Sequence, residues 1–289
     1  MKKLSLLGVL LLPAIFPVSA QLTVEVFQDQ EQFLPGEALV AAVRIVNRSG
    51  QTLSLGKEDN WLTFSIQSPD GLVVPQLSEV PVSGEFVLES SKMGTKRVDL
   101  APYFALNQPG RYSITATVRV KAWDRQIASP PRNFDLIHGS ELWQQEFGVP
   151  KTAADTNGTP EIRKYILQQA NYIKGQLRLY VRLTDATGAR TFRVFSVGRM
   201  VSFSRPEPQL DKLSNLHLLF ANGPHSFSYT VLSPDGELLA RQTYDYLNDS
   251  RPRLKVDETG TISVAGGSRR FTSTDLPAPE TAAAPTPAK

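Results

Sequence analysis

Apolar residues recur at every second position along three segments of the first half of the chain, residues 38–46, 61–67 and 112–120. In the third segment every even-numbered residue is apolar, whereas the odd-numbered residues are Ser, Thr and Arg. Because successive side chains of a strand point to opposite faces, this period of two predicts strands with one buried face. Pro, Gly, Asn and Asp cluster between the segments, as they do in tight turns. The first half is therefore predicted to be an antiparallel β-sandwich.

The most regular of these segments begins with a glycine and a tyrosine. Gly110 and Tyr112 have the spacing at which the phenol of a tyrosine corner bonds back to the preceding turn. The pair predicts a structural contact of this kind, and an ordinary tyrosine at a strand start is the alternative.

Alternation resumes in the second half, over residues 177–183 and 227–231. Turn sequences that end in Gly stand at residues 185–188, 233–236 and 257–260, and such sequences favour hairpins. The second half is therefore also predicted to be built from antiparallel strands.

Two stretches in the middle of the chain are less decisive. Residues 161–173 open like a helix, but their Tyr and Ile content and the turn that follows favour a strand. Residues 138–160 are interpreted as a linker with a possible short helix, capped by Ser140. In that helix Trp143 and Phe147, four residues apart, would share a face and pack between the halves, with an exposed aromatic platform as the alternative.

The sequences LPGE, VRIVNRSGQTL, PDG and PGRY occupy residues 34–37, 43–53, 69–71 and 109–112. They resemble bacterial extracytoplasmic immunoglobulin-like domains, in particular the intracellular-proteinase-inhibitor type of sandwich and macroglobulin-like modules. The resemblance covers residues 21–137 and implies an immunoglobulin-like fold and protease binding. No inhibitory loop residue of that family is matched position by position. The second half resembles bacterial secreted proteins of unknown function, with no named family.

The first twenty residues have the composition of a signal peptide. Lys2 and Lys3 precede an apolar run at residues 4–16, and the small residues 18–20 suit signal peptidase. We expect cleavage after Ala20 and a secreted or periplasmic protein. A membrane anchor is the alternative, but the run is shorter than the ~20 residues that span a bilayer. No later stretch is long and apolar enough to do so.

The predicted organisation is all-β, with two antiparallel sandwich-like domains and a disordered tail. Its parts are a signal peptide (1–20), an immunoglobulin-like sandwich (21–137), a linker (138–160), a second β-rich domain (161–271) and a tail (272–289). The polar end of the linker, residues 151–160, is the expected domain boundary. The tail is rich in Ala, Pro and Thr, a composition typical of disorder.

Composition narrows the possible chemistry. The 289 residues contain no cysteine, which excludes disulfide scaffolds, thiol enzymes, cysteine zinc sites and iron–sulfur clusters. Residues 21–150 hold 11 Lys and Arg against 15 Asp and Glu, a net charge of −4. Residues 151–289 hold 18 against 13, a net charge of +5. A bias of this size is weak evidence for a polyanionic partner, and no nucleic acid is expected.

The sequence contains no recognisable catalytic or metal-binding motif. The three histidines, His138, His217 and His225, are not accompanied by a Gly-x-Ser-x-Gly motif. The spacing of Asp211, His217 and His225 is not typical of a metal site. Two Asp-x-Thr-Gly segments have one residue too many for the loops of aspartic proteases, and no glycine-rich phosphate loop is present. We therefore predict no catalytic residue, no metal and no cofactor.

Arginines recur at alternate positions in the second half. Arg178 and Arg182 flank Tyr180 on the predicted outward face of one strand, and Arg193 follows in the next segment. Guanidinium groups with an aromatic neighbour suit sulfate, carboxylate or phosphate groups on a polymer, so these four residues are a candidate anionic-ligand patch. A solvated sheet face covered by long side chains is the alternative.

These observations favour an exported, non-catalytic binding or scaffolding protein of the cell envelope or exterior, with a protein or polysaccharide partner. A protease-inhibitor-like module and a polysaccharide-active enzyme or accessory domain are the alternatives. The first alternative depends on the resemblance of residues 21–137, and the second on carboxylates that the sequence does not pair.

Overall fold

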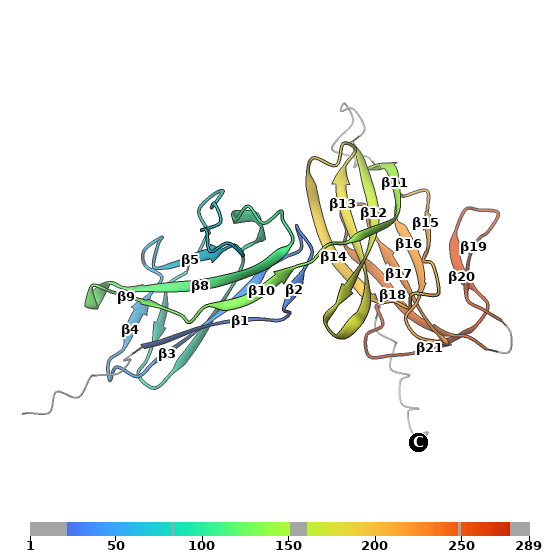
Figure 1. The fold of residues 1–289 in the computed structure, drawn as a ribbon. Coiled ribbons are helices and arrows are strands. Elements are labelled where there is room, and N and C mark those ends of the chain that lie inside the picture. The colour runs from blue at the N-terminus through green and yellow to red at the C-terminus, as the bar shows by residue number, and fades with distance from the viewer. Residues whose placement is uncertain (1–21, 83, 151–160, 248–249, 278–289) are drawn as a thin grey trace, which may run out of the picture.

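The computed structural model describes residues 22–82, 84–150, 161–247 and 250–277. In these residues the regular elements are β-strands and three single turns of 3-10 helix, and no α-helix is found. Figure 1 shows the strands gathered into two bodies that lie side by side. The prediction of an all-β chain is therefore confirmed. The described residues contain no helix with the length and hydropathy needed to span a membrane.

The first body is formed by ten strands. They are β1 (Leu22–Gln28), β2 (Gln32–Phe33), β3 (Val40–Asn47), β4 (Leu53–Leu55), β5 (Leu62–Gln67), β6 (Phe86–Leu88), β7 (Met93–Asp99), β8 (Gly110–Val120), β9 (Arg125–Ala128) and β10 (Arg132–Leu136). One sheet has the order β1-β3-β7, a second has the order β2-β10-β8-β5 with β9 also paired to β8, and β4 pairs with β6. Only β2 and β10 pair in parallel among the described strands.

The space between these sheets is filled by apolar side chains. The even-numbered residues of β8 from 112 to 120 are all buried, as the alternation predicts. Ile45, Ile66 and Ile114 are fully excluded from solvent. Phe134 is 1% exposed and stacks on the ring of Tyr112 at a centroid distance of 5.6 Å. The first body thus has one continuous apolar core, which supplies its main stabilisation.

The second body is formed by eleven strands. They are β11 (Ser140–Gly148), β12 (Ile162–Tyr172), β13 (Gln176–Asp185), β14 (Thr191–Arg199), β15 (Glu207–Leu210), β16 (Leu216–Ala221), β17 (Ser226–Leu232), β18 (Leu238–Asp245), β19 (Arg253–Val256), β20 (Ile262–Ala265) and β21 (Ser268–Arg270). Two antiparallel sheets, β11-β12-β13-β14 and β15-β16-β17-β18-β21, pack face to face, and β19 and β20 form a separate hairpin. The three hairpin turns expected in this half join β13 to β14, β17 to β18 and β19 to β20.

Three expectations from the sequence need correction, namely the helix within residues 138–160, the domain boundary at residues 151–160 and the start of the tail at residue 272. The helix expected within residues 138–160 is wrong, because Ser140–Gly148 is strand β11 and pairs with β12. Trp143 and Phe147 still share a face and pack into the second body, since positions four apart also coincide in a strand. Residues 151–160 lie outside the described residues, yet the strands on either side belong to one sheet. The chain therefore passes between the bodies before Ser140, not at residues 151–160.

The strand interpretation of residues 161–173 is confirmed by β12. The disordered tail does not begin at Thr272, because Leu276 exchanges backbone hydrogen bonds with Arg241 of β18 at 2.8 and 2.9 Å. The side chain of Asp275 is fully buried and pairs with Arg269. The rest of the expected tail, residues 278–289, and the expected signal peptide, residues 1–20, lie outside the described residues.

Candidate anion-binding site

The predicted arginine and tyrosine patch does not form an exposed surface. Tyr180 is fully buried, because the first body covers the outer face of β13 there. Its ring packs with Leu34 of the first body and with Ala170 and Val194 of the second. Burial raises the pKa of the Tyr180 phenol to about 12. The exposed patch proposed from the sequence is therefore wrong at its central residue, which belongs to the junction between the bodies.

The two arginines beside Tyr180 also contribute to this junction. Arg182 donates from Nη2 to the carbonyl oxygen of Pro35 at 2.9 Å. The guanidinium of Arg178 lies 3.5 Å from the ring centroid of Tyr172. Glu37, from the first body, is only 8% exposed, and burial raises the pKa of its carboxyl despite the nearby charge of Arg178. Arg182 thus bonds the second body to the first, whereas Arg178 lies against a ring of its own body, and these groups are not arranged around a free ligand site.

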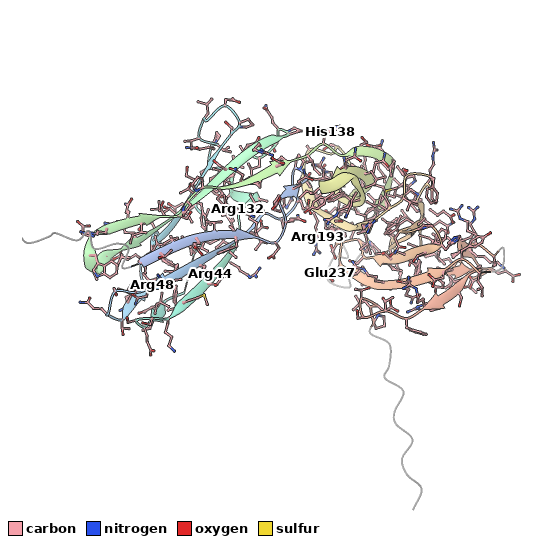
Figure 2. The ribbon with its side chains drawn as sticks, turned by 60° about the horizontal axis from the view of Figure 1, so that its bottom comes forward. Arg44, Arg48, Arg132, His138, Arg193 and Glu237 are labelled. Carbon is pink, nitrogen blue, oxygen red and sulfur yellow. The ribbon has the colours of Figure 1, made fainter. Side chains whose placement is uncertain are left out.

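Arg193 points to the other face of its sheet. Its Nη1 donates to the carbonyl oxygen of Gly236 at 3.0 Å, in the turn that joins β17 to β18. Figure 2 shows Arg193 close to Glu237, the last residue of that turn region. The structure thus separates Arg193 from the other three residues of the predicted patch.

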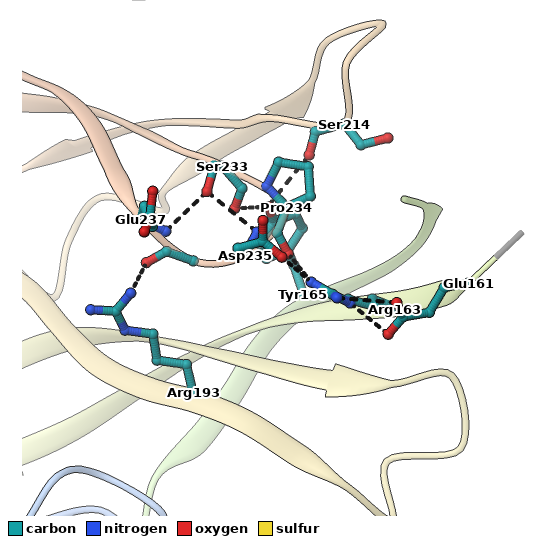
Figure 3. Close-up of polar contacts among 10 residues, drawn as sticks. Glu161, Arg163, Tyr165, Arg193, Ser214, Ser233, Pro234, Asp235 and Glu237 are labelled. Carbon is teal, nitrogen blue, oxygen red and sulfur yellow. Dashed lines mark hydrogen bonds and ion pairs between the residues drawn. The ribbon is translucent and has the colours of Figure 1, made fainter. Parts of the chain in front are cut away.

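The turn at residues 233–236 is held by a set of polar contacts that Figure 3 shows in detail. Arg163 donates from Nη1 to the carbonyl oxygen of Pro234 at 2.9 Å and to the carboxylate of Asp235 at 2.6 Å. Tyr165 donates from its hydroxyl to the carbonyl oxygen of Ser233 at 2.6 Å. Together with Arg193, these donors come from β12 and β14 and fix the turn of one sheet against the other sheet. This end of the second sandwich is closed.

The two faces of β17, the strand before this turn, have a different character. The alternation over residues 227–231 places Phe227, Tyr229 and Val231 on one face of β17, and Ser228 and Thr230 on the other. The apolar face is buried, but against the β19–β20 hairpin outside the sandwich. Ser228 and Thr230 are 8% and 0% exposed, so the polar face is buried as well. The inner face of this part of the sheet is therefore polar.

An open hollow of about 450 Å³ lies over this polar face, where β14 meets β17, β18 and β21. Three of its lining residues are Arg199, Arg241 and Arg270, which we call the arginine hollow. The other lining residues are Val197, Gly198, Phe220, Asn222, Ser226, Ser228 and Thr274. The lining thus combines three guanidinium groups with hydroxyl and amide donors and contains no Asp or Glu.

The charges of the arginine hollow are only partly neutralised. Arg270 pairs through Nε with Asp245 at 2.8 Å and donates from Nη2 to the hydroxyl of Ser226 at 3.0 Å. Neither Arg199 nor Arg241 has a carboxylate partner within the described residues. The Nε of Arg241 is buried and has no hydrogen-bond acceptor there. A buried guanidinium nitrogen without an acceptor is unfavourable, and an anionic ligand would remove that cost.

The backbone around the arginine hollow positions these side chains. Arg241 is held by the paired segment at Leu276, and Thr274 is brought to the rim by the same segment. The ion pair between Arg269 and Asp275, at 2.8 Å, fixes that segment against β21. The chain after β21, which the sequence suggested was disordered, therefore forms one wall.

Arg199 continues the series of arginines that recurs in the second half of the sequence, but the sequence pattern did not point to Arg241 or Arg270. One feature of the sequence could have indicated the arginine hollow, namely the Ser and Thr residues at alternate positions of β17. Polar side chains on one face of a strand, next to polar side chains of the neighbouring strand, indicate that this face is not part of an apolar core. Arg241 of β18 pairs with Thr230 of β17. The hairpin at residues 233–236 alone would pair Thr230 with Ala240, and a one-residue register shift between Val231 and Leu232 brings Arg241 to that position instead.

The tyrosine corner has the expected geometry. Tyr112 donates from its hydroxyl to the carbonyl oxygen of Gln108 at 2.7 Å, four residues upstream. Gly110 has a φ of 155°, and a Cβ there would lie 2.7 Å from the ring of Pro69. The pair is thus structural and lies far from the arginine hollow in the sequence and in the fold.

The histidines do not form a metal centre. His217 bonds to Tyr229 through Nδ1 at 2.7 Å and to Asp211 through Nε2 at 3.2 Å. Burial alone would raise the pKa of the Asp211 carboxyl. The hydrogen bonds from Asn215 and His217 have the larger combined effect and hold that pKa below its usual value. His225 lies elsewhere, beside Tyr246. Within the described ranges, no three His, Cys, Asp or Glu side chains are grouped as a metal site would require.

Burial raises the pKa of the Tyr229 phenol to about 12, so this hydroxyl stays protonated near neutral pH and takes part in a hydrogen bond with His217. The chain Asp211–His217–Tyr229 therefore acts as a buried connection between the loop before β16 and the sheet.

Comparison with known proteins provides little further constraint. No family model matches this chain, and no curated protein sequence matches it. Among solved structures, the crystal structure of the sporulation control protein Spo0M from Bacillus subtilis is similar with a TM-score of 0.30 and 9% identity. The match covers 62% of this chain and 91% of that chain. A likeness at this level carries no argument about function.

Proposed function

We propose that this protein is an exported, non-catalytic binding protein that holds anionic groups of an envelope or extracellular partner in the arginine hollow. The observation that carries the proposal is the convergence of Arg199, Arg241 and Arg270 from three strands onto one open space. Guanidinium groups offer planar pairs of N–H donors that match carboxylate, sulfate and phosphate oxygens.

The surroundings of these arginines support a ligand site. Hydroxyl groups of Ser226, Ser228 and Thr274 lie among them and supply donors of a second kind. The partly buried position of Arg241 lowers the effective dielectric constant and strengthens its attraction to an anion. The surplus of positive charge in residues 151–289 adds a longer-range attraction for the same class of partner.

The proposed location and the nature of the first body rest on the sequence. Export is proposed from the composition of residues 1–20, with cleavage after Ala20. The first body is proposed to be an immunoglobulin-like module, from the resemblance of residues 21–137 and from its antiparallel sheets and tyrosine corner. In this arrangement the first body is a scaffold that presents the second.

Replacement of Arg241 by glutamine tests the proposal. Arg241→Gln removes the charge but keeps a shorter polar side chain, and the matched control is Arg48→Gln, an exposed arginine of the first body. Binding of a sulfated and a carboxylated polysaccharide is measured by calorimetry at low and at physiological salt. We expect Arg241→Gln to weaken binding by about tenfold or more, as for loss of a charge-assisted hydrogen bond.

The control is expected to bind within about twofold of the unmodified protein, since an exposed charge contributes little. Because the lost atom is a buried donor without an acceptor, Arg241→Gln is not expected to lower the melting temperature. Equal affinities of Arg241→Gln and Arg48→Gln for every anionic polymer tested would contradict the proposal.

A further inference from the structure

A second hollow, of about 300 Å³, lies on the outer face of the sheet that carries the arginine hollow. Its walls include three aromatic rings, those of Phe203, Phe227 and Tyr246, together with His225 and Arg251. We call these five residues the aromatic pocket. The function proposed above does not use them.

The rings of the aromatic pocket are unusually accessible. Phe203 is 74% exposed and Tyr246 is 36% exposed, whereas Phe227 forms the buried floor at 6%. The ring of His225 lies 6.2 Å from that of Tyr246, at an interplanar angle of 45°. Exposed rings grouped around one concavity indicate a surface that binds a ligand with an apolar face.

A positive charge stands among these rings. Arg251 donates from Nη2 to the hydroxyl of Ser204 at 2.8 Å, and its guanidinium carbon lies 5.3 Å from the ring centroid of Phe227. Its Nε is buried and lacks a hydrogen-bond acceptor in the part of the chain that the structure describes. No carboxylate there pairs with Arg251. The aromatic pocket therefore suits a ligand that combines an apolar ring face with an anionic group.

The aromatic pocket and the arginine hollow meet at the turn between β16 and β17. Asn222 and Ser226, at the two ends of this turn, line the arginine hollow. Ala221 and Phe227, their neighbours in the chain, line the aromatic pocket because adjacent strand residues face opposite ways. A chain molecule that crosses the rim of the sheet at this turn reaches both sites.

We infer that both sites are occupied by one anionic polysaccharide, whose neighbouring sugar residues reach the arginine hollow and the aromatic pocket. This inference rests on the proposed function and specifies its ligand class. A pyranose ring presents a flat face of C–H groups that stacks on Phe203 and Tyr246, and its carboxylate or sulfate pairs with Arg251. An acidic polypeptide would satisfy the arginines but would leave Phe203 exposed, because aspartate and glutamate carry no such face.

The test uses the full mature chain and compares Phe203→Ala with Phe27→Ala. Phe27 is also partly exposed, at 39%, and also lies beside a guanidinium, that of Arg44 at 4.3 Å, but it belongs to the first body. The probes are polygalacturonate, its monomer galacturonate, neutral dextran and polyglutamate. Affinities are measured by calorimetry, with Arg241→Gln included to report on the arginine hollow.

We expect Phe203→Ala to weaken polygalacturonate binding by about tenfold, the effect of losing one stacked ring. Because a single galacturonate can occupy either site alone, Phe203→Ala and Arg241→Gln are each expected to weaken binding of the monomer less than binding of the polymer. Phe27→Ala should match the unmodified protein with every probe.

Two results would overturn the inference while leaving the proposed function intact. One is polygalacturonate binding that depends on Arg241 but not on Phe203. The other is polyglutamate binding as tight as that of polygalacturonate and equally weakened by Phe203→Ala, which would assign the pocket to an acidic protein. If no anionic polymer binds at all, the proposed function itself fails.

Discussion

The two bodies of this protein fill the space between their sheets in different ways. In the first body the facing side chains are apolar from end to end, with Phe134, Ile66 and Ile114 almost fully excluded from solvent. In the second body the apolar layer is centred on β12, β13 and β16, and it gives way to Ser228, Thr230 and Arg241 toward β18. The first body is a closed sandwich, and the second is closed at one end only.

The difference shows how one architecture provides both a scaffold and a site. The closed end of the second sandwich is fixed by Arg163, Tyr165 and Arg193, whose donors meet carbonyl oxygens of the turn at residues 233–236 (Figure 3). Because this end is held, the other end need not be filled with apolar side chains. The apolar face of β17 is covered by the β19–β20 hairpin instead, which leaves the inner face free for charged groups.

The largest expected effect comes from opening the closed sandwich. Phe134→Ala removes a ring that is 1% exposed and stacked on Tyr112, with Phe33 edge-on at 5.9 Å. We expect the free energy of unfolding to fall by about 3–5 kcal/mol, as for other buried Phe to Ala changes. Urea denaturation measures the loss, and amide exchange shows which body unfolds.

The control for this change is Phe27→Ala, an exposed phenylalanine of the same body, with an expected loss of about 0.5 kcal/mol or less. Equal losses for the two variants would mean that the first body is not a densely packed core, and the contrast with the second body would disappear.

The junction between the bodies gives the next effect. Glu37 accepts hydrogen bonds from the amide of Leu34 and from the side chain of Gln30, both at 2.9 Å. Glu37→Ala leaves these donors without an acceptor, at an expected cost of about 1–3 kcal/mol. Glu25→Ala, which removes a half-exposed carboxylate that lies 3.9 Å from Arg44, is the control.

The same residue gives a pH dependence of defined sign. Burial raises the pKa of Glu37 above 4.5, although the charge of Arg178 opposes this. The folded chain therefore binds the proton more tightly than the unfolded chain, and the resulting stability is fully present below pH 4.5 and lost as pH rises through the folded pKa. We expect Glu37→Gln to remove this part of the pH profile, measured by melting temperature from pH 4 to 8. An unchanged profile would exclude Glu37 as its source.

The tyrosine corner provides a smaller effect. Tyr112→Phe keeps the stacked ring but removes the hydrogen bond to Gln108, so we expect a loss of about 1 kcal/mol in the first body. Ligand binding by the second body should not change. A large drop in affinity would mean that the two bodies are coupled and that the comparison between them is too simple.

Much of this fold follows from periodicity. The alternation in residues 112–120 predicts β8 and its buried face, and the turn at residues 233–236 predicts the β17–β18 hairpin. The sites are harder to predict, because period two assigns a residue to a face but does not identify what covers that face. Tyr180 has the pattern of an outward residue and is buried by the first body, whereas Arg241 lies on an inner face that remains open. Both outcomes depend on packing between segments distant in the sequence.

The smallest expected effect is a direct test of the polar inner face. Thr230 is fully buried, and its hydroxyl has no hydrogen-bond partner within the described residues. Thr230→Val removes that hydroxyl, and we expect a gain in stability of up to about 1 kcal/mol, because a buried unpaired polar group is unfavourable. The reverse change in the first body, Val118→Thr, places a hydroxyl in an apolar core and should cost about 1–3 kcal/mol by the same reasoning. Urea denaturation of the two variants measures the expected gain and the expected loss in the free energy of unfolding. A clear loss of stability in Thr230→Val would show that the Thr230 hydroxyl has a hydrogen-bond partner, such as water in the arginine hollow. The contrast between the polar interior of the second body and the apolar interior of the first would then reflect solvation rather than packing.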